Sequence, residues 1–278
     1  MKQKVTLTLA RINYPKWLGK RDFINDMKNI VSSHVKFEDK KRGVKFFWVI
    51  TSVGQQQLDN GEVVFSGELN KIRATRISKV FDEAKWEMKP IPELWGVGES
   101  TSRFIIVPKY HVIAFEEKNV ISIERFIDVF KGLFVKSLNT FAPEVFSIRE
   151  GRLIYTIINE WENVQEAKFL KLRIPNPEDL PDFRKAVELL ENAGAENSSI
   201  TFQNEKEGLK VNANSIVDSM IALANRGYGI YEMKGTEKTG EVRKIRQGKY
   251  PIKFEIHVEK LEDFVLETIT IIKKFLGK

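Results

Sequence analysis

The sequence predicts an α+β fold of mixed, mainly antiparallel sheets with packed helices and basic hairpin arms. Apolar and polar residues alternate over 5–12, which is typical of a half-buried strand. Apolar residues recur every three or four positions over 21–33, which is typical of an amphipathic helix. Both periods return along the chain without an internal repeat, and basic residues gather where strands are expected to turn.

The first third of the chain is mostly strand-like. After the strand 5–12 and the helix 21–33, apolar and aromatic runs predict strands over 44–53 and 63–74, which would form a meander with a long arm. Trp, Pro and Gly residues then cluster over 85–102. Pro and Gly interrupt regular structure, so this segment is expected to be a loop or the edge of a subdomain.

Residues 103–134 predict a strand, strand and helix unit. The apolar runs 104–107 and 112–115 flank a short turn and are expected to pair as a hairpin. Ser122 stands just before an apolar helical pattern, and its hydroxyl can accept a hydrogen bond from the first turn. A helix is therefore expected from Ser122 to Phe134.

The second half mixes the two periods. Strands are expected over residues 153–158, 169–174, 200–202, 228–234, 241–245 and 252–258. Amphipathic helices are expected over residues 179–192, 214–226 and 261–276. Gly227 follows the second of these helices, where a left-handed cap is common. The segment 235–240 is expected to turn a hairpin.

Length and composition set the broad class. A chain of 278 residues with 42% hydrophobic content can bury one large core or two modest ones. We expect an N-terminal, mainly strand region over residues 1–100 with a basic arm, and an α+β region over residues 101–278 with a basic hairpin. The formal charge of +7 favours an anionic partner.

Several classes of protein are excluded or disfavoured. The absence of cysteine excludes disulfides, thiolate catalysis and cysteine-ligated metal sites. No apolar run reaches the length that spans a bilayer, and the N-terminus lacks the apolar block of a signal peptide. A cytoplasmic protein without membrane insertion and without a cofactor is therefore expected.

Basic clusters are the strongest functional signal. The densest runs from Lys234 to Lys253, with seven Lys or Arg against two acidic residues. Its candidate nucleic-acid-binding residues are Lys234, Lys238, Arg243, Lys244, Arg246 and Lys249. A basic hairpin can follow phosphates and release counterions. The alternative interpretation is a solvated edge strand, since lysines also protect exposed edges from aggregation.

A second cluster has no acidic residue within it, and alternation along a strand would place its first two cations on one face. Its candidate binding residues are Lys71, Arg73, Arg76 and Lys79. A third group, at residues 40–45, is offset by neighbouring acidic residues and is better interpreted as a charged turn.

Signals for catalysis are sparse. The three histidines, His34, His111 and His257, lack the spacing of metal ligands. Acid and base stand two residues apart at 83–85 and at Glu166 and Lys168, as some metal-dependent nucleases require, although such pairs arise readily by chance in a charged chain. The glycines at 96–98 and 227–229 do not match a phosphate-binding loop and are interpreted as turns.

The order of elements from about Arg103 onward resembles the RexA family of phage-exclusion proteins, among the prokaryotic anti-phage defence proteins. The resemblance rests on arrangement, namely the hairpin Phe104 to Phe115, the helix Ser122 to Phe134, the strand and helix around Phe169 to Gly194, and the helix and hairpin Ser215 to Arg246. It covers roughly 150 residues. It implies a DNA-binding, dimeric protein that lacks enzymatic activity and acts with a protein partner.

The sequence therefore favours a non-enzymatic protein that binds nucleic acid, preferably duplex DNA, through phosphate contacts with little base specificity. Two alternatives stay open. A metal-dependent nuclease would use the carboxylates, and a scaffold for protein–protein contacts would use the charged surface for an acidic partner.

Overall fold

The computed structural model describes residues 3–13, 23–41, 44–58, 60–75, 80–82, 87–89, 95–139, 143–149, 152–175, 183–192, 198–213, 215–247 and 251–276. The chain forms two compact units, each built from several segments. Unit 1 comprises Met1–Arg21, Val107–Ala114 and Pro143–Lys278, and unit 2 comprises Asp22–Ile106 and Phe115–Ala142. The α+β class is confirmed, because helices pack against antiparallel sheets in both units.

Unit 2 is built on an antiparallel sheet with the strand order β7-β4-β3-β2. Its strands are β2 (Phe37–Lys41), β3 (Val44–Gln57), β4 (Val63–Thr75) and β7 (Trp95–Val107), and a separate pair is formed by β5 (Val80–Asp82) and β6 (Glu87–Lys89). The expected strands 44–53 and 63–74 are confirmed, and β3 extends to Gln57.

The expectation of irregular structure up to residue 102 was wrong for its last part. Residues 95–102 belong to β7, where Gly96 lies opposite Ala74 and Gly98 opposite Ile72 of β4. Ladder pairing satisfies the backbone of these glycines, so tertiary contacts outweigh their poor strand propensity. The expected boundary near residue 100 consequently falls inside a strand.

Two helices complete unit 2, α1 (Phe23–Ser32) and α2 (Ile123–Leu138), and they pack against each other. The predicted cap of α2 is confirmed, because the backbone N–H of Arg125 donates to the Ser122 hydroxyl at 3.2 Å. Buried aromatic rings join α2 to the strands, and the Phe115 and Phe126 rings stack with their centroids 4.0 Å apart. The helical spacing of phenylalanines therefore marks the face of α2 that is buried.

Unit 1 contains two sheets. In the first, the strand order is β14-β1-β8, and β9 also pairs with β1. These strands are β1 (Gln3–Asn13), β8 (Val112–Glu116, of which residues 112–114 belong to unit 1), β9 (Glu144–Ser147) and β14 (Lys253–Val258), and α6 (Leu261–Leu276) packs on β14. The predicted strands 104–107 and 112–115 are confirmed within β7 and β8, which the short turn η2 (Pro108–Tyr110) connects along the chain.

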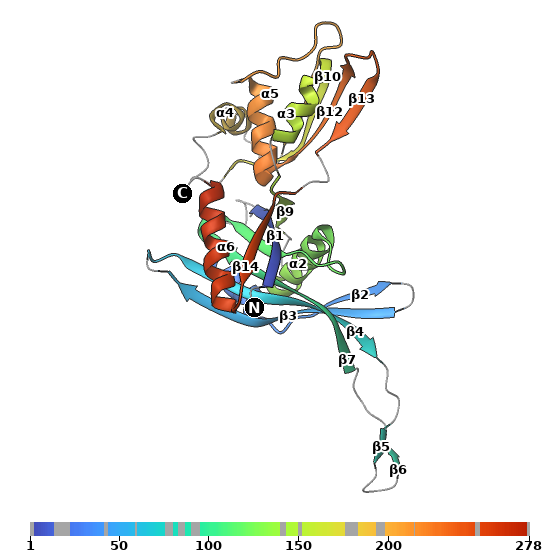
Figure 1. Cartoon of the computed structure of the whole chain (residues 1–278), viewed down its shortest axis with the longest axis vertical. Coiled ribbons are helices and arrows are strands. Elements are labelled where there is room, and N and C mark those ends of the chain that lie inside the picture. The colour runs from blue at the N-terminus through green and yellow to red at the C-terminus, as the bar shows by residue number, and fades with distance from the viewer. Residues whose placement is uncertain are drawn as a thin grey trace. The chain divides into compact units, whose positions relative to one another are not determined.

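The second sheet of unit 1 has the order β11-β10-β12-β13 and is antiparallel throughout. Its strands are β10 (Trp161–Leu172), β11 (Ser198–Gln203), β12 (Ile230–Glu237) and β13 (Val242–Arg246). Its inner face packs on α3 (Arg152–Asn159), α4 (Arg184–Asn192) and α5 (Ile216–Leu223), as Figure 1 shows for α4 and α5. The second core of the chain lies between this face and these helices.

The predicted strand 153–158 was wrong, because these residues form α3. Isoleucine, threonine and tyrosine favour strands, which suggested the wrong element. The segment is nevertheless amphipathic at helical spacing, since Ile154, Ile157 and Ile158 all face the core beneath the sheet. Burial of this face outweighs the strand propensity of the individual residues.

The predicted end of the late helix is confirmed at Gly227, which has φ +86 at the end of η4 (Ala224–Tyr228), a π-helical turn that follows α5. A β-carbon on Gly227 would lie 2.6 Å from the β-carbon of Arg11 on β1. Arg11 is buried, donates through Nη1 to the Tyr110 carbonyl at 2.6 Å, and lies over the Tyr228 ring. The glycine therefore allows η4 to approach β1 closely.

Candidate nucleic-acid interface

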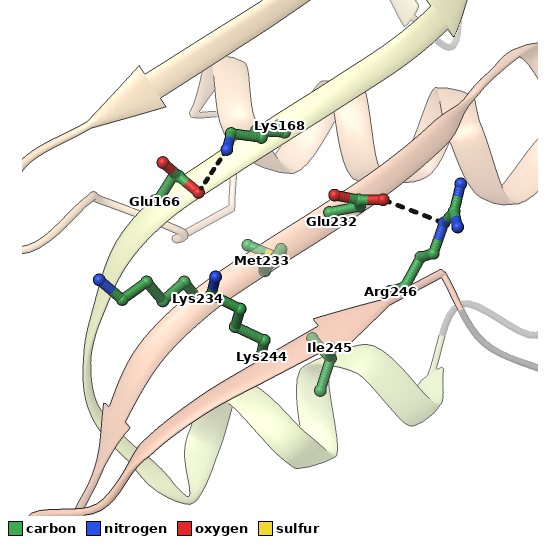
Figure 2. A pocket seen from close by; sticks show the side chains of 8 residues that line it. All are labelled: Glu166, Lys168, Glu232, Met233, Lys234, Lys244, Ile245 and Arg246. Carbon is green, nitrogen blue, oxygen red and sulfur yellow. Dashed lines mark ion pairs between the residues drawn. The ribbon is translucent and has the colours of Figure 1, made fainter.

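The outer face of the four-stranded sheet gathers charged side chains from three strands, which line a shallow groove of about 230 Å³ (Figure 2). The strand register places them in two rows. One row runs Glu166, Lys234 and Lys244, and the other runs Lys168, Glu232 and Arg246. The residues between the rows, including Met233, face the core because side chains alternate along a strand.

A β-bulge in β10 determines which residues reach this face. Val164 pairs with Gly235 of β12 and Glu166 pairs with Lys234, so Gln165 is an extra residue in β10. A bulge shifts the alternation of all the residues that follow it. Glu166 and Lys168 consequently share the outer face with the lysines of β12 and β13.

Lys234 and Lys244 lie at closely spaced positions of the sheet. The backbone N–H of Glu237 donates to the Glu241 carbonyl and that of Gln247 donates to the Tyr231 carbonyl, which defines the hydrogen-bonded pairs of this hairpin. Lys234 lies three residues from both Tyr231 and Glu237, and hydrogen-bonded and non-hydrogen-bonded pairs alternate along the strands, so Lys234 and Lys244 form a non-hydrogen-bonded pair. In such pairs the side chains are closest, and directly opposed like charges are destabilising by about 0.2–1 kcal/mol.

Two internal ion pairs compensate part of the positive charge. Arg246 Nε lies 3.0 Å from a Glu232 carboxylate oxygen, and Lys168 Nζ lies 3.1 Å from a Glu166 carboxylate oxygen. Across the described residues, neither Lys234 nor Lys244 has an acidic partner. Among the described residues, the groove is therefore lined by four cations and two carboxylates, and the two cations without an acidic partner lie on β12 and β13.

The dense basic cluster divides between the two faces. Lys234, Lys244 and Arg246 meet in the groove. Arg243 points to the opposite face, where it pairs with Glu237 at 2.7 Å. Lys238 lies in the turn between β12 and β13 and is exposed, and Lys249 lies outside the described residues.

The hairpin itself is part of the sheet. β12 continues to Glu237, so the turn begins after the expected position at residue 235, and β13 forms the edge of the sheet. Pairing with β10 along the whole of β12 holds the basic residues in a fixed register. The described hairpin is therefore a sheet edge and not a separate arm.

The second basic cluster offers less free charge. Lys71 and Arg73 lie two residues apart in an uninterrupted register with β3, which places them on one face of β4 as predicted. Lys71 is 15% exposed, pairs with Glu99 at 2.7 Å and lies over the Phe46 ring. Arg73 is exposed, and Arg76 and Lys79 lie outside the described residues.

The candidate nuclease residues lie in the same groove. Glu166 and Lys168 bind each other there, whereas the pair at 83–85 lies outside the described residues. Within the part of the chain that the structure describes, no three His, Asp or Glu side chains come together as a metal site would require. Glu166 and Glu232 are the carboxylates among the residues that line this groove, and each is bound in an ion pair.

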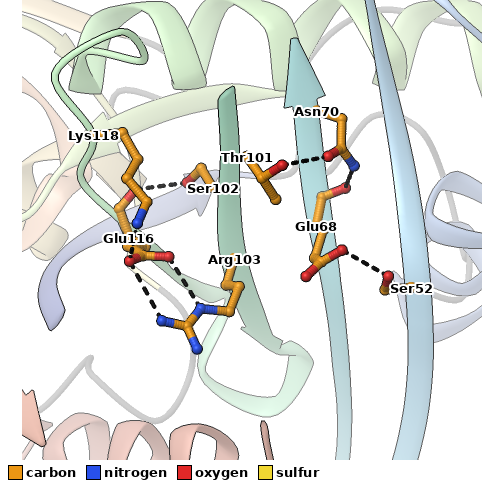
Figure 3. Close-up of polar contacts among 8 residues, drawn as sticks. All are labelled: Ser52, Glu68, Asn70, Thr101, Ser102, Arg103, Glu116 and Lys118. Atoms are coloured by element: carbon orange, nitrogen blue, oxygen red, sulfur yellow. Dashed lines mark hydrogen bonds and ion pairs between the residues drawn. The ribbon is translucent and has the colours of Figure 1, made fainter. Parts of the chain in front are cut away.

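Unit 2 has a charged network of a different kind, around the buried carboxylate of Glu116 (Figure 3). Arg103 Nε donates to it at 3.0 Å, and Lys118 also binds it. Burial acts to raise the pKa of Glu116, but the hydrogen bonds and charges of Arg103 and Lys118 outweigh burial and lower the pKa. A second chain of contacts runs between strands, since Thr101 donates to Asn70 and Ser52 donates to Glu68. The polar groups of this network hydrogen-bond to one another and hold the strands together.

Glu232 is the site residue that the sequence analysis missed. The signal was present, because Glu232, Lys234 and Thr236 alternate with the buried or core-facing residues Tyr231 and Met233. That alternation predicts a common face for Glu232 and Lys234. The partner of Glu232 on β13 depends on the hairpin register. A turn at 235–240, as expected from the sequence, would have given a different register and a different partner.

The sequence model of one protein family, described as a domain of unknown function (DUF4747), matches residues 27–274. The chain belongs to the DUF4747 family. The match includes β10, β12 and β13, so the groove lies within the DUF4747 domain. Comparison with curated proteins gave no match. None of the described helices combines the length and apolar character that crossing a bilayer requires.

Proposed function

We propose that this DUF4747 protein binds the backbone of nucleic acid, preferably duplex DNA, through the outer face of β10, β12 and β13. One observation carries the proposal. Lys234 and Lys244 oppose each other at the closest spacing in the sheet without an acidic partner among the described residues. A bound phosphate between two ammonium groups would relieve their repulsion and accept hydrogen bonds from both.

The chemistry of the groove favours phosphate contacts over base contacts. Its cations lie on a flat sheet face and beside an edge strand, and none projects from a helix that could enter a major groove. Contacts of this type position a protein on the backbone and carry no sequence information directly. Duplexes of unrelated sequence should therefore bind with similar affinity.

The decisive experiment is a salt titration of binding to duplex DNA, single-stranded DNA and RNA of matched length. Affinity for duplex DNA should fall with salt by about 0.9 log unit per log unit for each phosphate neutralised. Strong preference for one duplex among several of matched composition would contradict backbone binding. A complete lack of binding at 50 mM salt would reject the proposal.

A metal-dependent nuclease is the second candidate, because Glu166, Glu232 and Lys168 lie in the same groove as the free lysines. Two carboxylates can hold a divalent cation, and a lysine can stabilise the charge that develops on a phosphate. Cleavage of a labelled duplex with Mg²⁺ or Mn²⁺, lost in Glu166→Gln, would favour this candidate. Binding without cleavage would favour the first.

The resemblance to the RexA family supports a role for DNA binding in phage exclusion, as a dimer acting with a partner protein. A scaffold that holds an acidic protein partner would use the same face without nucleic acid. Plating of phages on cells that carry the wild-type gene or a groove variant tests the role in exclusion. Loss of protection in a variant that has lost DNA binding would support it.

A further inference from the structure

We propose that Glu232, with Glu166 beside it, is a built-in competitor of the bound polyanion: it holds Arg246 until a phosphate chain displaces it. This inference rests on the proposed function and concerns the regulation of the same groove. Of the four cations of the outer face, two are open to a ligand, and the other two, here called latent, are bound to a carboxylate.

The open part of the groove is the pair Lys234 and Lys244, which lacks an acidic partner among the described residues. The latent part consists of Arg246 and Lys168, each bound to a carboxylate of the same face at 3.0 and 3.1 Å. Both latent cations are still accessible, since their side chains are 69% and 41% exposed. A phosphate can therefore approach them without rearrangement of the sheet.

The ion pairs are weak enough to exchange. Exposed pairs gain little because water screens them, so a phosphate that is already held nearby can replace the carboxylate. Lys244 and Arg246 lie two residues apart on β13, which places their α-carbons about 6.7 Å from each other. One phosphate at the open pair would bring the next phosphate of a polymer toward Arg246, whereas a free phosphate ion lacks this linkage.

The groove should therefore discriminate between a polyanion and a single anion. Inorganic phosphate would meet the two open lysines only. A nucleic-acid backbone would meet the lysines and would also displace Glu232 from Arg246. The ligand class that this arrangement fits is a chain of closely spaced phosphates.

The test compares Glu232→Gln with Glu237→Gln. Both substitutions remove one negative charge from β12, but Glu237 pairs with Arg243 on the opposite face at 2.7 Å. Glu232→Gln should bind duplex DNA about two- to fivefold more tightly, since it removes the competing ion pair. Its salt slope should stay close to that of the wild-type protein, because Arg246 contacts a phosphate in both complexes. Glu237→Gln should not strengthen binding by a comparable amount.

A double-mutant cycle separates competition from a general effect of charge. In an Arg246→Ala background, Glu232→Gln should no longer strengthen binding, because the cation that it releases is absent. An equal gain in Glu237→Gln, no gain in Glu232→Gln, or a gain that persists without Arg246 would each overturn the inference while leaving the proposed function intact. Failure of the wild-type protein to bind DNA would instead reject the proposed function and this inference with it.

Discussion

Replacement of Lys234 and Lys244 by alanine is the perturbation that tests the groove most directly. Neither lysine has an ionic partner among the described residues, and the two oppose each other at a non-hydrogen-bonded position of β12 and β13. Their removal relieves a like-charge contact and leaves the backbone ladder intact. The double variant should therefore fold with little change in its free energy of unfolding.

The size of the effect follows from the number of contacts that are lost. Each phosphate contact contributes about 0.9 to the slope of log affinity against log salt, so the double variant should lose about 1.8. Over a fourfold increase in salt, this difference amounts to a factor of about 12. The affinity deficit of the variant should thus be about twelvefold larger at 50 mM salt than at 200 mM.

Fluorescence anisotropy with a labelled duplex, measured at several salt concentrations, provides the two slopes. The matched control is Lys238→Ala with Arg243→Ala, which removes the same charge from the turn and from the opposite face of the same hairpin. The control should keep most of the wild-type slope. Equal slopes for both double variants would show that total charge governs binding, and would refute the assignment of the groove.

Three further predictions concern stability. Arg103→Ala should lower the free energy of unfolding by about 3 kcal/mol in urea denaturation, because the buried Glu116 carboxylate loses one of its two cations. Glu116 has a lowered pKa in the folded state, so its contribution is present above about pH 4.3 and is lost as the pH falls through the folded pKa; Glu116→Gln should remove this part of the acid sensitivity. Gly227→Ala should cost about 3 kcal/mol in thermal unfolding, whereas Gly240→Ala should cost about 1 kcal/mol. Both glycines have φ +86, but only a β-carbon at Gly227 meets a neighbour, at Arg11, so equal costs would contradict the role of the close approach.

Most elements of the fold were predictable because their local periods agree with their tertiary environment. The helical spacing over 123–134 matches the buried residues of α2, whereas the alternation over 5–12 predicts the strand β1 but not its burial, because residues 7–13 are all buried. The exceptions are segments where the local sequence pattern and the tertiary environment favour different elements. Residues 152–159 combine residue types that favour strands with the apolar spacing of a helix. Burial of their apolar face in the core beneath the sheet stabilises the helix. Gly96 and Gly98 favour a loop by residue type, but their pairing with β4 stabilises the strand.

The sequence by itself determined the class of the fold, most of its helices and strands, and the presence of a basic hairpin with Lys234, Lys244 and Arg246. These features depend on local composition and period, which a single chain displays directly. Only the tertiary structure shows that Glu166 and Lys168 lie in one groove with the hairpin residues and that Arg243 lies on the opposite face. That outcome depends on the bulge at Gln165 and on the register between strands about 65 residues apart along the chain, where a slip of one position would turn every side chain to the other face.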